Sequence, residues 1–380
     1  MRSVAENFWP QCNIKTPDSF NGCIGNRFAN WSFSVCGMSR CGLTLVITGR
    51  QSPFSNGFMN SDAATLTQLI SFLTSSASVR EKVSIRTAYE PAQALAGETR
   101  LGDDCAAIRD GDGWLLLAAE GMLPSFVADD PWFAGYSAVM VNLSDVAAMG
   151  GRPLAIVDVL WTPGLDQSGP IWDGMSAASK AYGVPIVGGH TTATKSGSPF
   201  LAAAVLGRAK RLITSFDAIA DDDLLVAIDL RGTWRREKPF WNASVDAPPG
   251  RLRADLNLLP ALAENGWCRA GKDISNGGIV GTLAMLLDCS SAGAELWLDQ
   301  LPRPAGVNLE RWIISFPSFG YLLSISPKNS ERVIAHFAAR EIACAVAGRI
   351  TSGRSLLLGY GAAREPFPLW EVSGPHARSR

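Results

Sequence analysis

Hydrophobic runs alternate with helix-like patterns between residues 83 and 206. Apolar residues three or four positions apart indicate helices at Trp132–Met149 and Gly169–Tyr182. Short apolar runs bounded by turn residues indicate strands at Trp114–Ala119, Leu154–Leu160, Pro185–Val187 and Phe200–Leu206. This order of elements predicts an α/β or α+β fold.

A second set of elements follows a boundary that we place near residues 208–217. Strands are expected at Leu224–Ile228, Tyr321–Ser326 and Ile342–Ala347, and helices at Leu252–Ala263, Gly277–Leu287 and Asn329–Arg340. We therefore predict an α+β protein built from two α/β domains, residues 59–208 and 209–365, with a tail at 366–380.

The first 58 residues have a different character. They are rich in Asn, Ser, Gly and Cys and contain one short apolar run, Leu43–Thr48. We expect a poorly ordered extension, with the functional protein beginning near Met59. Ser61 and Asp62 are then predicted to cap a helix over Ala63–Leu73.

Composition narrows the functional classes. The 380-residue chain has a formal net charge of −1, which argues against an electrostatic nucleic-acid surface. No apolar run approaches the roughly 20 residues of a membrane helix, and the start lacks a secretory apolar core. The eight cysteines show neither CxxC nor zinc spacing. We expect a reduced cytoplasmic protein that binds neither nucleic acid nor membrane.

One helix carries an isolated charge. Asp145 is the only charged residue between Asp130 and Arg152, and Asn142 lies three positions earlier on the same helix face. Gly150 and Gly151 then stop the helix. A carboxylate on so apolar a helix needs hydrogen-bond donors, a cation or a metal ion. A structural Asp satisfied by N–H groups is the alternative.

Two further carboxylate motifs flank the predicted strand at residues 114–119. Asp103 and Asp104 are adjacent and repel each other, so they are either solvated in a plain turn or neutralised by a cation. Glu120 ends the strand, where it is a metal ligand or a solvated charge.

Two glycine-containing stretches suit an anion. Gly188 and Gly189 follow the predicted strand Pro185–Val187 and precede His190, so their N–H groups can approach an anion. Asp273, Ser275 and Asn276 open the predicted helix at 277–287, whose N-terminus offers N–H groups. A structural loop histidine and a simple helix cap are the alternatives.

These motifs fit metal-bridged polyphosphate. The chain has no Walker loop, kinase glycine loop or dinucleotide-binding fingerprint. Carboxylates for divalent ions and backbone donors for phosphate are what phosphoryl transfer requires.

The order of motifs resembles the PurM-like superfamily of aminoimidazole ribonucleotide synthetase. That group includes thiamine monophosphate kinase, selenophosphate synthetase and a hydrogenase maturation protein. The resemblance covers roughly residues 73–351 and is most specific from Asp130-Pro131 through Asn142-Leu143-Ser144-Asp145 to Gly150-Gly151-Arg152-Pro153. It implies an ATP-binding homodimer whose N-terminal domains pair their sheets, with a C-terminal α/β domain closing over the site.

The resemblance also implies roles for individual residues. Asp104 and Asp145 would bind the Mg²⁺ that bridges the ATP phosphates, with Asp103 and Asp273 as additional ligands. Glu120 aligns either with a metal-binding Asp or with the Glu of a Val-Glu-Gly. Asn142 would orient a ligand. The implied phosphate contacts are Gly188, Gly189, Arg208 and Ser275.

Departures from the kinase pattern fall on the acceptor side. His190 stands where the kinase has Asp, as in selenophosphate synthetase, and Asn276 replaces the second Asp after Asp273. The kinase's Gly-Glu-Asp-Tyr-Glu-Leu is Ser318–Leu323 here. We therefore expect His190 and Asn276 to act on the acceptor. Cys36 and Cys41 superficially resemble the reactive cysteine of selenophosphate synthetase.

The sequence thus predicts ATP- and Mg²⁺-dependent phosphoryl transfer to a small metabolite, with thiamine monophosphate kinase as the most similar activity. Two alternatives stay open. One is ATP-dependent activation of a metabolite's carbonyl or amide oxygen, as in the synthetases, and the other is a nucleotide-binding subunit without catalysis. No motif identifies the metabolite.

Overall fold

The computed structural model describes residues 54–85, 92, 95–194 and 197–368. One compact unit begins at Phe58, and everything below concerns that unit. Residues 1–53 of the predicted extension, with Cys36 and Cys41, lie outside the described residues, as do residues 369–380 of the tail. Among the described helices, none is long and apolar enough to cross a membrane.

Helix α1 spans Phe54–Ser75 and starts earlier than predicted. Ser61 and Asp62 lie inside it, so the predicted cap is wrong. Asp62 instead accepts a hydrogen bond from the Ala362 backbone N–H at 3.2 Å. Leu66, Leu69 and Leu73 bury one face of α1 in the core, which makes this helix part of the fold.

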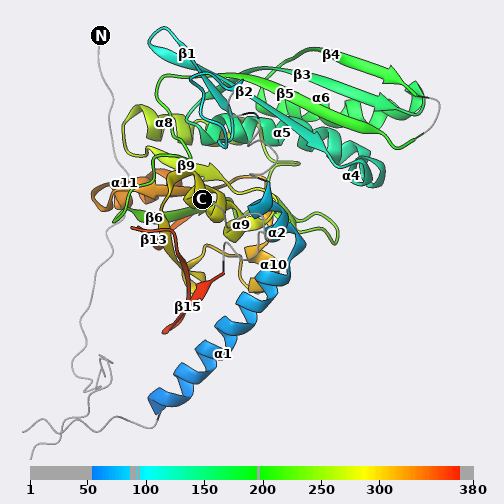
Figure 1. Ribbon diagram of the computed structural model, residues 1–380. Coiled ribbons are helices and arrows are strands. Elements are labelled where there is room, and N and C mark those ends of the chain that lie inside the picture. Colours follow the sequence, from blue (N-terminus) through cyan, green and yellow to red (C-terminus); the bar gives the residue numbers. More distant parts are fainter. Residues whose placement is uncertain (1–53, 86–91, 93–94, 195–196, 369–380) are drawn as a thin grey trace, which may run out of the picture. The chain divides into compact units, whose positions relative to one another are not determined.

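A five-stranded sheet forms the first part of the unit (Figure 1). Its order is β1 (Ala106–Asp110), β2 (Gly113–Met122), β5 (Phe200–Ala209), β3 (Arg152–Thr162) and β4 (Ile186–Ala193). Only β3 and β4 pair in parallel. Helices α4 (Pro124–Asp129), α5 (Pro131–Ala148) and α6 (Gly169–Tyr182) lie on one side of the sheet.

Helix α5 is buried along nearly its whole length, from Phe133 to Ala148. Close packing against α6 explains this, because both helices place glycine at the contact. A Cβ on Gly135 would lie 2.1 Å from the Ile171 carbonyl oxygen, and one on Gly174 would lie 1.9 Å from that of Trp132. The polar side chains of α5 are therefore held in the protein interior.

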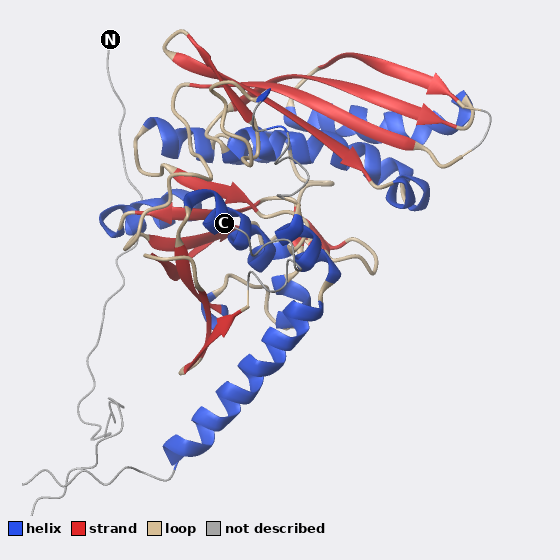
Figure 2. Ribbon diagram, in the orientation of Figure 1, coloured by secondary structure: helices blue, strands red, loops and turns tan. Residues whose placement is uncertain are grey.

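None of the described helices α4, α5 and α6 lies on the other side of the five-stranded sheet (Figure 2). The strand register places Leu117 opposite Leu206, and Trp161 opposite Phe200, on this open face. Apolar side chains that are 39–47% exposed line it, namely Ile108, Leu117, Val157, Trp161 and Leu206. An apolar sheet face of this kind is typical of a surface that a partner covers.

A seven-stranded sheet forms the second part of the unit. Its order is β15 (Ala363–Phe367), β14 (Leu356–Tyr360), β10 (Gly293–Trp297), β13 (Ala343–Thr351), β6 (Asp223–Ile228), β12 (Gly320–Ile325) and β9 (Ala270–Asp273). Central β6 is buried on both faces, because Leu224, Val226 and Ile228 join one apolar cluster and Leu225 and Ala227 another.

Helices cover both faces of this sheet. Helices α1, α2 (Ala77–Ser84) and α9 (Gly278–Ser290) contribute to the first cluster. Helices α8 (Leu258–Glu264) and α11 (Pro327–Ala338) contribute to the second. The remaining elements are α7 (Pro249–Leu256), α10 (Leu309–Ile313), the short helices η2 (Leu165–Ser168) and η3 (Leu298–Gln300), and a small sheet of β11 (Phe316–Pro317), β8 (Phe240–Asn242) and β7 (Thr233–Trp234).

The predicted mixed α/β fold class is confirmed, and several element boundaries are corrected. The helix expected over Leu252–Ala263 is two helices, α7 and α8, which meet at Asn257. The loop expected after Val187 is wrong, because Gly188 to Ala193 continue β4 and pair with β3. The domain limits at 208 and 209 stay predictions.

Candidate metal and nucleotide site

Three carboxylates meet where helix α5 packs against strand β9 of the seven-stranded sheet. Asp104 precedes β1, Asp145 lies on α5, and Asp273 ends β9. One oxygen from each lies within 4.8 Å of the others. The exposed fraction is 6% for Asp145 and 4% for Asp273, and the side chain of Asp104 is also 4% exposed. Three segments far apart in sequence therefore build one buried acidic group.

Asp145 lacks the partners that a structural carboxylate would have. Its Oδ2 atom has no hydrogen-bond partner among the described residues. Burial, followed by repulsion from Asp273, Glu120 and Asp104, raises its pKa well above the ordinary value. A desolvated carboxylate in this position is relieved by a cation or a proton. The geometry therefore disfavours an Asp satisfied by N–H groups.

Asp273 has the same character. Burial and the neighbouring Asp104 raise its pKa to about 8. Its backbone N–H lies 3.4 Å from Asp104 Oδ2, which ties β9 to the turn before β1. Oxygen atoms of carboxylates are the ligands that Mg²⁺ prefers. The Asp104–Asp145–Asp273 group, which we call the carboxylate triad, therefore suits a hard divalent cation.

Asp103 points away from the triad. Its two oxygens accept hydrogen bonds from Ser215, one from the hydroxyl at 2.7 Å and one from the backbone N–H at 2.9 Å. Burial and the adjacent Asp104 raise its pKa to about 6. In this arrangement Asp103 anchors the turn that presents Asp104, and its predicted role as a metal ligand stays a prediction.

Two lysines reach the triad, and sequence reasoning missed both. Lys272 lies on β9 and its ammonium contacts Asp104 Oδ1. Burial alone would lower the pKa of Lys272, but Asp104, Asp103 and Asp273 raise it overall, so the group stays charged. Lys82 lies on α2 and donates to Ser275 Oγ at 2.7 Å. The only available signal was that Lys272 directly precedes Asp273.

Glu120 lies on β2, and Asn276 follows Asp273 by three positions. Both side chains are exposed. The pKa of Glu120 is raised overall, chiefly by desolvation, with Lys82 opposing the rise and Asp104 adding to it. Glu120 therefore interacts electrostatically with the triad. Ser275, at the entry to α9, accepts from Lys82 and donates its N–H to Thr282 Oγ1 at 3.3 Å. Polar groups thus surround the exposed approach to the buried carboxylates.

Asn142 lies behind the triad on α5 and is fully buried. Its Nδ2 donates to the carbonyl oxygens of Ala138 at 2.8 Å and Ala203 at 3.3 Å. Its Oδ1 has no partner among the described residues. Asn142 therefore links α5 to β5, and its predicted role toward a ligand stays a prediction.

The other predicted site residues lie on the five-stranded sheet, away from the triad's contacts. Gly188, Gly189 and His190 belong to β4, the edge strand opposite β1. His190 Nε2 lies 3.0 Å from Thr192 Oγ1. Gly189 leaves room for a buried carboxylate, because a Cβ there would lie 2.0 Å from Asp158 Oδ1. Arg208 on β5 pairs with Asp110 at 2.8 Å.

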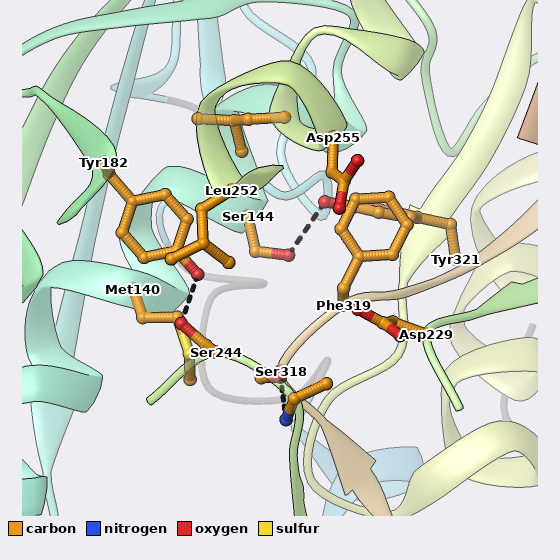
Figure 3. Close-up of a pocket in the computed structure, with 12 residues that line it drawn as sticks. Met140, Ser144, Tyr182, Asp229, Ser244, Leu252, Asp255, Ser318, Phe319 and Tyr321 are labelled. Carbon is orange, nitrogen blue, oxygen red and sulfur yellow. Dashed lines mark hydrogen bonds between the residues drawn. The ribbon is translucent and has the colours of Figure 1, made fainter. Parts of the chain in front are cut away.

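A small cavity with both polar and apolar lining residues lies between α5 and β12 (Figure 3). It holds about 20 Å³, room for a water molecule but not for a metabolite. The hydroxyl oxygens of Ser144 and Tyr321, two of the lining residues, lie 3.2 Å apart. Ser144 directly precedes Asp145 on α5, and Tyr321 pairs with Asp273 between strands β12 and β9. This cavity is therefore too small to be the metabolite site.

Comparisons with known proteins match both parts of the chain. The AIR synthase related protein N-terminal domain matches residues 102–209, which include Asp104 and Asp145. The C-terminal domain of the same family matches residues 233–360, which include Asp273. Lys82 lies outside both matches.

Individual relatives agree with this result. An uncharacterized Synechocystis protein is 47% identical over 312 residues, covering 81% of this chain and 96% of that protein. A thiamine-monophosphate kinase of Pyrococcus horikoshii is 32% identical over 184 residues, covering 46% and 56%. Thermotoga maritima PurL complexed with ATP has the same fold, with a TM-score of 0.61 and 18% identity over 71% of this chain.

The chain spans about half the length of the kinase and of PurL, 56% and 46% respectively. Together the two family matches cover most of the chain from residue 102 to residue 360. The resemblance seen in the sequence is thereby confirmed, and the protein belongs to the AIR synthase related protein family.

Proposed function

We propose that this protein is an enzyme that uses ATP and Mg²⁺ to transfer a phosphoryl group to a small metabolite. The observation that carries the proposal is the carboxylate triad, in which the buried Asp145 Oδ2 has no partner among the described residues. Support comes from the ATP complex of PurL and from the phosphoryl transfer named for the Pyrococcus relative.

The donor set fits Mg²⁺, which Asp104, Asp145 and Asp273 would hold. When bound, the ion would neutralise charge on the ATP phosphates during transfer. Ser275 stands at the start of α9, where helix N–H groups and the dipole favour phosphate. The protein's contribution is to fix these groups before the substrates arrive, so that little reorganisation accompanies the reaction.

We also propose that the chain forms a homodimer through the open face of the five-stranded sheet. Apolar side chains on one face, among them Leu117, Trp161 and Leu206, are more than a third exposed. Covering such a face with a second copy removes apolar surface from water. The predicted ligand roles of Gly188, Gly189, His190 and Arg208 remain proposals.

The acceptor separates two enzymatic versions of the proposal. Phosphorylation of a metabolite such as thiamine monophosphate is the first. Activation of a carbonyl or amide oxygen is the second, and it is favoured by His190 and Asn276, which stand where the kinase has Asp. The two predict different products from the same bound ATP.

The test compares the wild-type protein with Asp145→Asn. Calorimetry would measure MgATP binding, and ADP formation would be followed across a metabolite panel that includes thiamine monophosphate. We expect turnover to fall at least about 100-fold in Asp145→Asn, because a charge-stabilising interaction of several kcal/mol is lost. Asp158→Asn is the matched control, since the carboxylate of Asp158 on β3 is also buried and has no side-chain hydrogen-bond partner among the described residues.

The outcomes separate the candidate functions. Asp145→Asn with full turnover would contradict the proposal. MgATP binding without ADP formation for any metabolite would instead support a nucleotide-binding subunit that lacks catalysis. ADP formation that depends on thiamine monophosphate would identify the kinase.

A further inference from the structure

Lys82 is held in a defined position beside the triad. Its ammonium donates to Ser275 Oγ at 2.7 Å. Its aliphatic stem packs over Gly277 and Gly281. A Cβ added to Gly277 would lie 3.1 Å from Lys82 Cβ, and one added to Gly281 would lie 3.4 Å from it. Helix α2 therefore delivers a cation to the entry of α9, although α2 and α9 are far apart in sequence.

The ammonium of Lys82 has N–H donors that can bind a ligand. A lysine has three N–H donors, and Ser275 is its one hydrogen-bond partner among the described residues. Lys272 differs, because it is 3% exposed and its ammonium is bound to Asp104. Lys82 is half-buried on the solvent side. A ligand that approaches the triad therefore meets Lys82 before it meets Lys272.

The charges near Lys82 define the ligand. The bond from Lys82 to Ser275, two positions after Asp273, places the positive charge of Lys82 beside the triad. The carboxylates of the triad would repel a free anion, and Lys82 would weaken the binding of a free cation. A divalent cation carrying a polyphosphate satisfies both, with the cation on the carboxylates and a phosphate oxygen on the ammonium.

We propose that Lys82 is a phosphate-binding residue, whose ammonium, held by Ser275, donates to a phosphate oxygen of a metal-bound polyphosphate. The inference rests on the proposed function, because it uses the triad as the cation site. It adds a residue that lies outside both family matches, at residues 102–209 and 233–360. The segment before residue 102 then belongs to the site.

The experiment compares affinity for the metal ion alone with affinity for phosphate ligands, because loss of Lys82 should weaken only the second. Full-length wild type, Lys82→Met and Lys82→Arg are titrated by calorimetry with Mn²⁺ alone, with Mg-tripolyphosphate and with MgATP. In Lys82→Met, affinity for both phosphate ligands should fall about 10- to 100-fold, the effect of one charge-assisted hydrogen bond. Affinity for Mn²⁺ alone should stay equal or rise, because a positive charge near Asp273 is gone.

The controls separate phosphate binding from a structural role. Lys82→Arg should keep most of the affinity for phosphate, and Lys180→Met, a lysine on α6, should change neither affinity. If Lys82→Met fails to fold by circular dichroism, Lys82→Gln replaces it, since its amide can still bond to Ser275.

Each remaining result decides the matter. A wild-type protein that binds neither MgATP nor tripolyphosphate overturns both the proposed function and this inference. Wild-type binding with unchanged binding by Lys82→Met overturns the role of Lys82 alone. Equal losses for Mn²⁺ and for the phosphates in Lys82→Met also overturn it, because they indicate a structural lysine.

Discussion

Replacing Asp273 with Asn tests whether the triad is built for a cation, because the change should stabilise the metal-free protein. Asp273 is buried, and its pKa is raised from an ordinary 3.8 to about 8. A carboxyl group with a raised folded-state pKa contributes stability below pH 3.8 that is lost as pH rises through about 8. Above pH 8 the wild-type protein therefore carries the full cost of a buried charge.

The magnitude follows from the shift in pKa. At about 1.4 kcal/mol for each pKa unit, the rise from 3.8 to about 8 corresponds to about 6 kcal/mol of unfolding free energy. Asn carries no charge and escapes this cost. In EDTA, Asp273→Asn should therefore be several kcal/mol more stable than wild type at pH 9 and close to wild type at pH 4.

Urea unfolding at both pH values, with EDTA or with Mg²⁺, measures the effect. Saturating Mg²⁺ should stabilise wild type at pH 9, by about 2.7 kcal/mol at 100 times its Kd, and should leave Asp273→Asn nearly unchanged. Asp158→Asn controls for burial alone, since the pKa of Asp158 is raised by desolvation outside the triad. It should gain stability and keep the wild-type response to Mg²⁺.

An Asp273→Asn protein that is less stable than wild type at pH 9 in EDTA would contradict this prediction. Equal stabilisation of both proteins by Mg²⁺ would contradict it as well. Either result would mean that Asp273 is a structural carboxylate whose contacts outweigh its repulsion from Asp104.

Three further predictions follow from the same geometry. Lys272→Met removes the buried partner of Asp104, so thermal melting in EDTA should show that the free energy of unfolding falls by about 3–5 kcal/mol. Mg²⁺ should restore part of this loss, and an unchanged melting curve would contradict the pairing. Mg²⁺ affinity by calorimetry should be lower at pH 6.5 than at pH 8.5, because protons compete for Asp273 below about pH 8; a flat profile would count against it. Trp161→Asp, on the open sheet face, should shift sedimentation from dimer toward monomer, and an unaltered dimer would exclude this face as the interface.

The sequence predicted the parts of the site that carry a strong local pattern. Asp145 stood out because no other charge lies between Asp130 and Arg152, and its helix was placed within one residue at each end. Asp104 and Asp273 stood out as carboxylates beside glycine or a helix start. Each prediction needed only neighbouring residues.

The rest depends on contacts between distant segments. Lys82 meets Ser275 across 193 positions of sequence, which no local period records. Strand β9 is four residues long and buried throughout, too short to show an alternation. Gly188 and Gly189 suggested a loop because glycine is uncommon in strands, but pairing with β3 and the space needed by Asp158 make them strand residues.

The most direct test of the central claim is a crystal structure of the full chain soaked with Mn²⁺ and a non-hydrolysable ATP analogue. An anomalous difference map locates the ion without relying on activity. The account predicts a peak roughly 2.0–2.3 Å from oxygens of Asp104, Asp145 and Asp273, with the analogue's phosphates beside it. Bound analogue with no Mn²⁺ peak at the triad, or a peak elsewhere, would contradict it.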